Sequence, residues 1–356
     1  MIRTEGILAV TERERVVKAI SFDSPDRTPR DLWWLPTVEL EQQSELKGVL
    51  SRYPRDIVVA AAKPGRSKKQ RESSLPPRFN YGNDIPRVGR YIDEWGCIRH
   101  VLEDGVTGEV KEPPLADWEA LDDLEPPWEF LESTNFEPVK EQRENSTKFI
   151  LSGVCARPFE RMQFLRGTEN LLQDLVLNKQ LVMKLRDMVH EYNLEHIRRW
   201  LATDVDALWL MDDWGAQNNL LISPDMWTKI FKPLYREYCE MIHAAGKFVF
   251  LHSDGWIEIL YDEFVDVGVD AINSQLFCMN IERIGELHQG KITFWGELDR
   301  QWLLPSGTPE EIRQAVRRVR RALDDGSGGV IAHCSWGKND PKENILAAFE
   351  EWEKPQ

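Results

Sequence analysis

From residue 149 onward, short apolar runs alternate with longer helical segments, and this alternation constrains the fold of the 356-residue chain more than any other feature. The apolar runs are rich in β-branched and aromatic residues and have strand length: 149–154, 207–211, 247–251, 269–272, 291–295 and 329–332. Helical patterns separate them: 169–203, 224–245, 256–265, 280–288 and 308–323. Repeated β-α alternation predicts a parallel sheet, arranged as an open doubly wound sheet or a closed barrel.

Helix ends in this region carry the expected signals. Thr308 and Pro309 form an N-cap and a first helical residue, and Gly246, Gly268 and Gly290 each follow a helical segment directly before a strand. No Gly-x-Gly-x-x-Gly motif follows any of the strands, which argues against a dinucleotide-binding sheet. The pattern therefore favours an α/β protein with a single (β/α)8 barrel, a fold that commonly reaches this length as one domain.

The first 147 residues are less regular and are expected to add an N-terminal elaboration and the first strands, with the regular units in 148–356. Thr11 and Glu14 form a capping box that opens a helix through residue 20. Further patterns predict strands at 31–35 and 57–62, an exposed basic loop at 63–72, and a hairpin within 94–112. All of 1–356 is assigned to one barrel domain.

The charge and the cysteine content of the sequence argue against several classes of binding partner and structural site. The chain has 45 Lys and Arg against 60 Asp and Glu, a net charge of −15, so it lacks the basic face that nucleic acids require. Its five cysteines never form a Cys-x-x-Cys pair, so neither a disulfide framework nor a zinc ribbon is indicated. The apolar run at 6–10 is too short for a signal peptide, and no stretch has membrane-span length. We expect a cytoplasmic protein with no membrane partner; the oligomeric state stays open.

Each of the six regular strands ends in polar or metal-capable residues. In a barrel of this type, the carboxyl ends of the strands carry the chemistry. The residues at these ends are Cys155 to Arg157, Asp212 to Trp214, His252 to Gly255, Asn273 to Gln275, Glu297 with Asp299, and His333 to Ser335.

His252 and Asp254 are two residues apart, so extended backbone would direct both side chains to one face. With Cys334 from another strand they would form a zinc site with one open position, and Glu297 is a further candidate ligand. The alternative is a hydrogen-bonded histidine at the barrel mouth beside a small buried cysteine.

Asp212 and Asp213 are the candidate catalytic carboxylates, with His252, because adjacent like charges raise one pKa and suit proton transfer. Capping of the following segment is an equally plausible role for them. Arg157 could bind a substrate carboxylate or phosphate, or it could form a surface ion pair.

The sequence contains 14 tryptophans, some of them beside these polar ends. Trp95, Trp214, Trp256 and Trp336 could line an aromatic substrate pocket, or they could serve ordinary core packing. Gln217, Asn273 and Gln275 are the expected polar substrate contacts.

Several segments together resemble the uroporphyrinogen decarboxylase superfamily, in particular its cobalamin-dependent methyltransferase-like branch. These are TERERVVKAISFDSPDRTPRDL, YIDEWGCIRHVLEDGVTGEVKEPPLADWEALDD, MDDWGAQNNLLISPDMW, HAAGKFVFLHSDGWIEIL, VGVDAINSQ, WGELDRQWLLPSGTPEEIRQAV, GGVIAH and PKENILAAFEEW. They follow the expected order over essentially the whole chain. The resemblance implies a single (β/α)8 barrel with its site at the carboxyl mouth.

The resemblance also separates two branches of the superfamily. The decarboxylases use an N-terminal Arg-Gln-Ala-Gly-Arg-Tyr segment, whereas this chain reads DLWWLPTVEL there. The corrinoid methyltransferases use a zinc site of His-x-Cys-Gly and a later Cys, which activates a thiol. Here His252 matches, Asp254 replaces the first Cys, and Cys334 lies near the later one.

The resulting hypothesis is a corrinoid-linked methyltransferase or demethylase with a divergent zinc site. Its substrate would be a small molecule with a methoxyl, thiol or amine group, aromatic ones included, and cobalamin or a corrinoid protein would carry the methyl group. One alternative is a metal-independent decarboxylase of a small carboxylated substrate. Another is a non-catalytic binding protein that retains the barrel.

Overall fold

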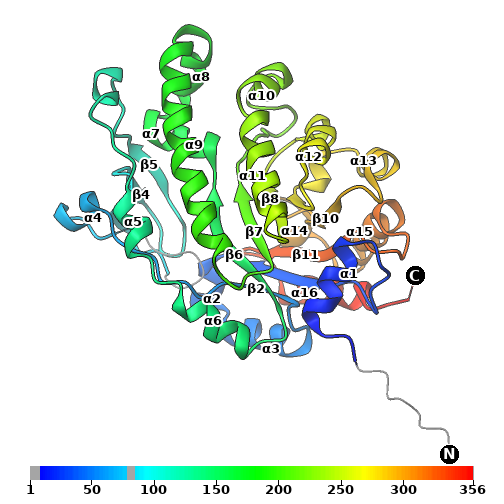
Figure 1. Cartoon of the computed structure of the whole chain (residues 1–356). Coiled ribbons are helices and arrows are strands. Elements are labelled where there is room, and N and C mark those ends of the chain that lie inside the picture. Colours follow the sequence, from blue (N-terminus) through cyan, green and yellow to red (C-terminus); the bar gives the residue numbers. More distant parts are fainter. Residues whose placement is uncertain (1–8, 78–84, 356) are drawn as a thin grey trace, which may run out of the picture.

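Eight parallel strands form the centre of the computed structural model, which describes residues 9–77 and 85–355 (Figure 1). Their order is β1-β11-β10-β9-β8-β7-β6-β2. Asp56 N donates to Arg30 O across the remaining gap at 2.8 Å, so the sheet is nearly closed. The predicted (β/α)8 barrel is confirmed. The strands are β1 (Arg30–Trp34), β2 (Ile57–Val59), β6 (Phe149–Ala156), β7 (Ala207–Met211), β8 (Phe248–Ser253), β9 (Ala271–Ser274), β10 (Thr293–Gly296) and β11 (Val330–Trp336).

Helices surround the barrel, as Figure 1 shows. The capping boxes at Thr11 and Thr308 are present, and Gly246, Gly268 and Gly290 have positive φ angles of 70°, 99° and 75°. The α-helices are α1 (Glu12–Ile20), α2 (Pro36–Glu41), α3 (Gln43–Arg52), α4 (Lys68–Glu72), α5 (Trp128–Ser133), α6 (Glu137–Glu144), α7 (Pro158–Arg166), α8 (Thr168–Leu177), α9 (Lys179–Leu201), α10 (Pro224–Ile230), α11 (Lys232–Ala244), α12 (Tyr261–Val267), α13 (Ile281–His288), α14 (Leu303–Ser306), α15 (Pro309–Leu323) and α16 (Lys342–Trp352). Short 3₁₀ helices are η1 (Trp118–Leu121), η2 (Glu258–Leu260) and η3 (Leu276–Cys278).

Two long predicted helices are divided in the structure. The segment 169–203 breaks at Asn178 between α8 and α9, and 224–245 breaks at Phe231 between α10 and α11. The second break has a clear cause, because Pro233 has no backbone N–H and cannot continue the hydrogen-bond ladder of α10.

The N-terminal elaboration contains an antiparallel sheet of β3 (Gly89–Ile92), β4 (Ile98–Val101) and β5 (Glu109–Glu112), which includes the predicted hairpin. The prediction of an exposed loop at 63–72 is wrong in its second half. Ser67 caps the short helix α4, and Ser67 and Gln70 are both buried. Arg161 of α7 donates to Asp93 at 2.6 Å, which ties the loop after β3 to the helix layer of the barrel.

Side chains inside the barrel alternate with those facing the helices. The interior cluster includes Phe149, Ala207, Phe250, Trp295 and Ile331, and each has neighbours in the outer cluster one residue away on its strand. Strands β8 and β11 run further than predicted, to Ser253 and Trp336, so this alternation extends through the polar residues at their ends. Among the helices of the described ranges, none has both the length and the apolar character needed to cross a bilayer.

Candidate active site at the carboxyl ends of the strands

Counting in steps of two from the interior residues identifies which polar side chains enter the barrel mouth. From Phe250 this count reaches His252 and Asp254, and from Ala207 it reaches Trp209 and Asp213. The same count places Asn273, Glu297, His333 and Ser335 on the inner side of their strands. These side chains make the contacts described below.

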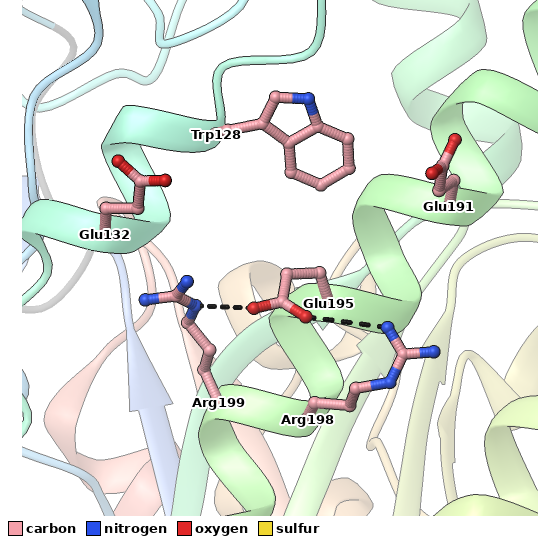
Figure 2. Close-up of a pocket in the computed structure, with 6 residues that line it drawn as sticks. All are labelled: Trp128, Glu132, Glu191, Glu195, Arg198 and Arg199. Carbon is pink, nitrogen blue, oxygen red and sulfur yellow. Dashed lines mark hydrogen bonds and ion pairs between the residues drawn. The ribbon is translucent and has the colours of Figure 1, made fainter.

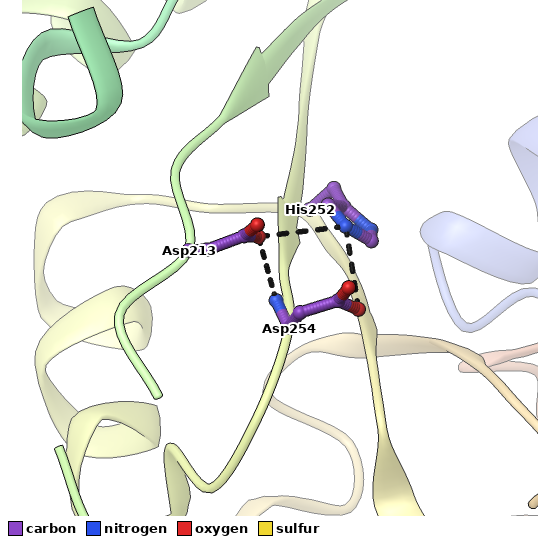
Figure 3. Close-up of side chains that lie close together, drawn as sticks. All are labelled: Asp213, His252 and Asp254. Atoms are coloured by element: carbon purple, nitrogen blue, oxygen red, sulfur yellow. Dashed lines mark hydrogen bonds and ion pairs between the residues drawn. The ribbon is translucent and has the colours of Figure 1, made fainter. Parts of the chain in front are cut away.

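His252, Asp213 and Asp254 form a compact cluster (Figure 3). His252 Nε2 lies 3.7 Å from Asp213 Oδ1 and 3.5 Å from Asp254 Oδ1. The backbone N–H of Asp254 donates to Asp213 Oδ1 at 2.9 Å, which fixes the two loops relative to each other. One donor atom from each residue lies within 4.8 Å of the others, so the three side chains could share one cation.

The other ring nitrogen of His252 is held by a buried amide. His252 Nδ1 lies 2.6 Å from Asn273 Oδ1, while Asn273 Nδ2 donates to the carbonyl of Trp295 at 2.6 Å. The second bond fixes the orientation of the amide, so its oxygen accepts a hydrogen bond from the N–H at His252 Nδ1. Nε2 is therefore the nitrogen that faces the two carboxylates, with its lone pair available when His252 is neutral.

Asp254 also belongs to a second chain of charges. Arg300 donates to Asp254 Oδ2, and Arg300 Nε lies 3.5 Å from Glu297 Oε2. The hydroxyl of Ser335 donates to the other oxygen of Glu297 at 2.8 Å. Glu297 is only 2% exposed, and its Oε2 has no hydrogen-bond partner.

Burial and mutual repulsion shift the pKa values of this group. Burial raises the pKa of Asp213 to about 6, with Glu160 and Asp254 adding repulsion and His252 opposing it. Burial also raises the pKa of Glu297. For His252, burial disfavours the charged ring, but the nearby Asp254, Asp213 and Glu297 outweigh it and raise the pKa. These shifts favour the neutral form of Asp213 and the charged form of His252.

Asp212 points away from this cluster. Its carboxylate accepts hydrogen bonds from the backbone of Phe159 and Glu160 at 3.0 and 2.7 Å, in the first turn of α7, and from Tyr235 Oη at 2.8 Å. Burial raises its pKa to about 8, against these hydrogen bonds. Of the two adjacent aspartates, Asp213 reaches the barrel mouth and Asp212 holds a helix.

Cys334 is not brought to the cluster. It lies between inward-facing His333 and Ser335, and it packs with the outer residues that include Leu32 and Ala332. Burial raises the pKa of its thiol. The combination of His252, Asp254 and Cys334 expected from the sequence is therefore not assembled, and Asp213 occupies the third place.

The tryptophans expected around a substrate are elsewhere too. Trp214 is buried and stacks on Phe159 at 4.6 Å, Trp95 packs on Tyr192, and Trp336 Nε1 donates to the carbonyl of Asp340. Trp256 packs, half-buried, against the outer cluster. Arg157 is paired with Glu160 at 3.1 Å.

A different aromatic layer lies beneath His252. The ring of Trp33 is 5.4 Å from His252, 4.8 Å from His333, 5.2 Å from Trp209 and 5.0 Å from Trp295. Trp33 and Trp209 are half-buried, whereas Trp295 is fully buried. These residues were missed from the sequence although they share the inward parity of their strands.

A small pocket of about 80 Å³ adjoins the cluster. Its polar lining includes the predicted contacts Gln217 and Gln275 together with Cys278, Arg300 and Gln301. Within this lining, Gln217 and Gln301 exchange hydrogen bonds of 3.2 Å. Asn273, in contrast, is buried behind His252 and does not line this pocket.

A larger hollow of about 300 Å³ lies outside the barrel, between α5 and α9 (Figure 2). It is lined by Trp128 and charged side chains, among which Glu195 bridges Arg198 and Arg199. Its lining contains no buried unpartnered polar atom and no inward strand residue. We therefore place the chemistry at the barrel mouth despite the smaller volume there.

The fold and this cluster define a (β/α)8-barrel protein with a histidine–carboxylate centre at the carboxyl ends of its strands. The sequence profile of the uroporphyrinogen decarboxylase (URO-D) family matches residues 95–353, so the chain belongs to this family. No curated protein gives a significant sequence match.

A comparison with solved structures finds similar chains. A methyltransferase from Methanosarcina mazei aligns with a TM-score of 0.70 at 14% identity, over 97% of this chain and 99% of the other. The YdhT protein from Bacillus subtilis aligns with a TM-score of 0.42 at 9% identity, over 92% of this chain and 90% of the other. The first similarity establishes a common fold over the whole length.

The donor set fits a divalent metal ion. One imidazole nitrogen and two carboxylates are ligands that zinc and similar transition metals accept. His252 Nδ1 is tied to an amide oxygen, the arrangement usual behind a metal-binding histidine. Asp254 Oδ1, which faces His252, is buried without a hydrogen-bond partner, so it has a free site for a cation.

Proposed function

We propose that this protein is a metal-assisted methyltransferase or demethylase of the uroporphyrinogen decarboxylase family, with a corrinoid as methyl carrier. The observation that carries the proposal is the position of His252 Nε2 between Asp213 and Asp254 at the barrel mouth. The family assignment and the full-length fold shared with a methyltransferase support it.

Each residue of the centre has a task in this proposal. His252, Asp213 and Asp254 would hold the metal ion, and Asn273, by binding Nδ1, would leave Nε2 of His252 free for it. When bound, the metal ion lowers the pKa of a substrate group and makes it a better nucleophile or leaving group. As a ligand, Asp213 would also orient the substrate group at the metal ion. Trp33 and Trp209 pack together beneath the centre and provide an apolar floor for it.

The ligand types favour one part of the substrate range. Two carboxylates and one imidazole make a harder site than the cysteine-rich zinc sites that activate thiols. A hydroxyl, methoxyl or amine substrate therefore suits this centre better than a thiol. The adjoining pocket offers side-chain amides from Gln217, Gln275 and Gln301, which bind a small polar group.

The alternatives receive less support from the geometry. A metal-independent decarboxylase needs a free arginine for the substrate carboxylate, but Arg157 is paired with Glu160 and Arg300 with Asp254. A non-catalytic binding protein would not need His252, and substitution of that residue separates the two cases.

The test combines metal analysis with methyl transfer. Protein purified without added metal should contain close to one equivalent of zinc or a similar ion, and methyl exchange with methylcobalamin should be measurable. His252→Ala should lose the metal and lower the rate at least about 100-fold, as expected for loss of a ligand. Cys334→Ala, which changes a buried residue on the outer side of β11, is the control and should keep both.

Two results would contradict the proposal. Wild-type protein that neither contains nor binds a divalent metal would refute the metal centre. Wild-type protein that releases carbon dioxide from small carboxylated substrates, yet exchanges no methyl group with any cobalamin form, would favour decarboxylation.

A further inference from the structure

We propose that Arg300 is a built-in competitor for the metal ion: its guanidinium occupies one oxygen of Asp254 and lowers the affinity of the centre for divalent cations. This inference rests on the metal centre of the proposed function. It concerns how tightly the centre binds its ion and how many oxygens of Asp254 are available to that ion.

The contacts of Arg300 place it at the edge of the cluster. It donates to Asp254 Oδ2, while Asp254 Oδ1 faces His252 Nε2 at 3.5 Å and has no hydrogen-bond partner. Its Nε lies 3.5 Å from Glu297 Oε2, which likewise lacks a hydrogen-bond partner and is buried. One guanidinium thus pairs with two carboxylates that would otherwise be available to a metal ion.

The carboxylates around His252 explain why the positively charged Arg300 lies beside them. Asp213, Asp254 and Glu297 bring up to three negative charges together around His252. Such carboxylates repel one another in a buried site unless a positive charge compensates them. Arg300 supplies that charge to two of the three, and the pKa of Arg300 is raised by Glu297 and Asp254 although burial opposes this.

Two consequences for metal binding follow. A guanidinium and a divalent ion that share one carboxylate would repel each other enough to change affinity roughly tenfold even at the dielectric constant of water. While Arg300 holds Oδ2, Asp254 can offer a metal only Oδ1. Single-oxygen binding suits small four-coordinate zinc, whereas larger ions such as Ca²⁺ prefer more oxygen ligands and often bind both carboxylate oxygens.

The experiment compares metal affinities of intact variants. Metal-free wild type, Arg300→Gln and Arg300→Lys are titrated with zinc against a chromophoric chelator, and with Ca²⁺ by calorimetry. We expect R300Q to bind zinc about 10-fold or more tightly than wild type, with a larger gain for Ca²⁺. R300K keeps the charge and should stay within about threefold of wild type for zinc.

Arg157→Gln is the matched control, because it removes one positive charge that is paired with Glu160 instead of Asp254 or Glu297. It should change zinc affinity less than about threefold. Thermal unfolding followed by circular dichroism confirms that each variant is folded; if R300Q does not fold, Arg300→Met is titrated in its place.

The outcomes separate this inference from the proposed function. Wild type that binds zinc no more weakly than a folded R300Q or R300M overturns the competitor role and leaves the metal centre standing. Zinc binding by R300Q but not by wild type supports the competitor role and contradicts a metal-dependent wild type. If no variant binds a metal, both ideas fail.

Discussion

At the scale of single residues, the two ring nitrogens of His252 have separate duties. Nδ1 is fixed by Asn273, and Nε2 faces two carboxylates. The carbonyl of Trp295, on a neighbouring strand, fixes the orientation of the Asn273 amide. That amide in turn fixes which ring nitrogen of His252 carries the proton. This division predicts that Asn273 acts on the centre without lining the pocket.

Replacement of Asn273 by leucine should lower zinc affinity about 10- to 100-fold, the usual cost of losing the partner of a metal-binding histidine. The reason is that His252 loses the acceptor that fixes its tautomer. Chelator competition measures the affinity. Ser274→Ala is the neighbouring control, because Ser274 bonds to Tyr261 away from the centre. Equal affinities for N273L and wild type would show that Asn273 has no positioning role.

At the scale of elements, strand parity assigns different work to adjacent residues. After β7, Asp212 follows the outer side and caps α7, whereas Asp213 follows the inner side and meets His252. The same rule applies to two neighbours in β11: the side chain of His333 faces the barrel interior, whereas that of Cys334 faces the helices.

Asp212→Ala should therefore cost stability more than function. It leaves two backbone N–H groups of α7 and the Tyr235 hydroxyl without their buried partner, which should lower the free energy of unfolding by about 2–4 kcal/mol. Asp213→Ala should cost about 1 kcal/mol in stability but abolish tight zinc binding. Urea unfolding and metal titration measure the two effects. The reverse pattern would contradict these assignments.

Much of the barrel could be predicted from sequence because its strands are apolar runs with clear helical partners. The cluster was only partly predictable. His252, Asp213 and Asp254 carry an obvious signal, since they end strands. Cys334 was misjudged because the point at which a strand stops is weakly encoded, and the unrecognised extension of β11 left the direction of its side chain undetermined. Trp33 was missed although it lies within the predicted strand 31–35, because a tryptophan in an apolar run does not show which face of the strand it occupies. Arg300 is positioned by a loop whose course no local pattern specifies.

At the scale of the whole molecule, the amino ends of the strands serve stability. Asp270, just before β9, accepts hydrogen bonds from His243 at the end of α11 and from the backbone of Val249 in β8. The hydrogen bond to Asp270 raises the pKa of His243 above 6.5, although burial opposes it. This pair links a helix to two strands at the face opposite the centre.

Stability should consequently depend on pH through His243. A pKa that is higher in the folded state adds stability that is fully present below about pH 6.5 and is lost as pH rises through the folded pKa. The side chain is 42% exposed, so solvent screening keeps the contribution below about 1 kcal/mol. His243→Gln should therefore lose more stability relative to wild type at pH 6 than at pH 9, as measured by urea unfolding. An equal difference at both pH values would contradict the linkage.

The tryptophan layer beneath His252 leaves the site open toward one end of the barrel. The rings of Trp33, Trp209 and Trp295 lie 5.0–6.1 Å from one another inside the barrel, so we expect reactants to reach His252 from the carboxyl ends of the strands. For any group transferred at His252, the donor molecule and the acceptor molecule would therefore use the same entrance. With a single entrance, a reactant bound next to the tryptophans must enter before, and leave after, a reactant that covers the mouth.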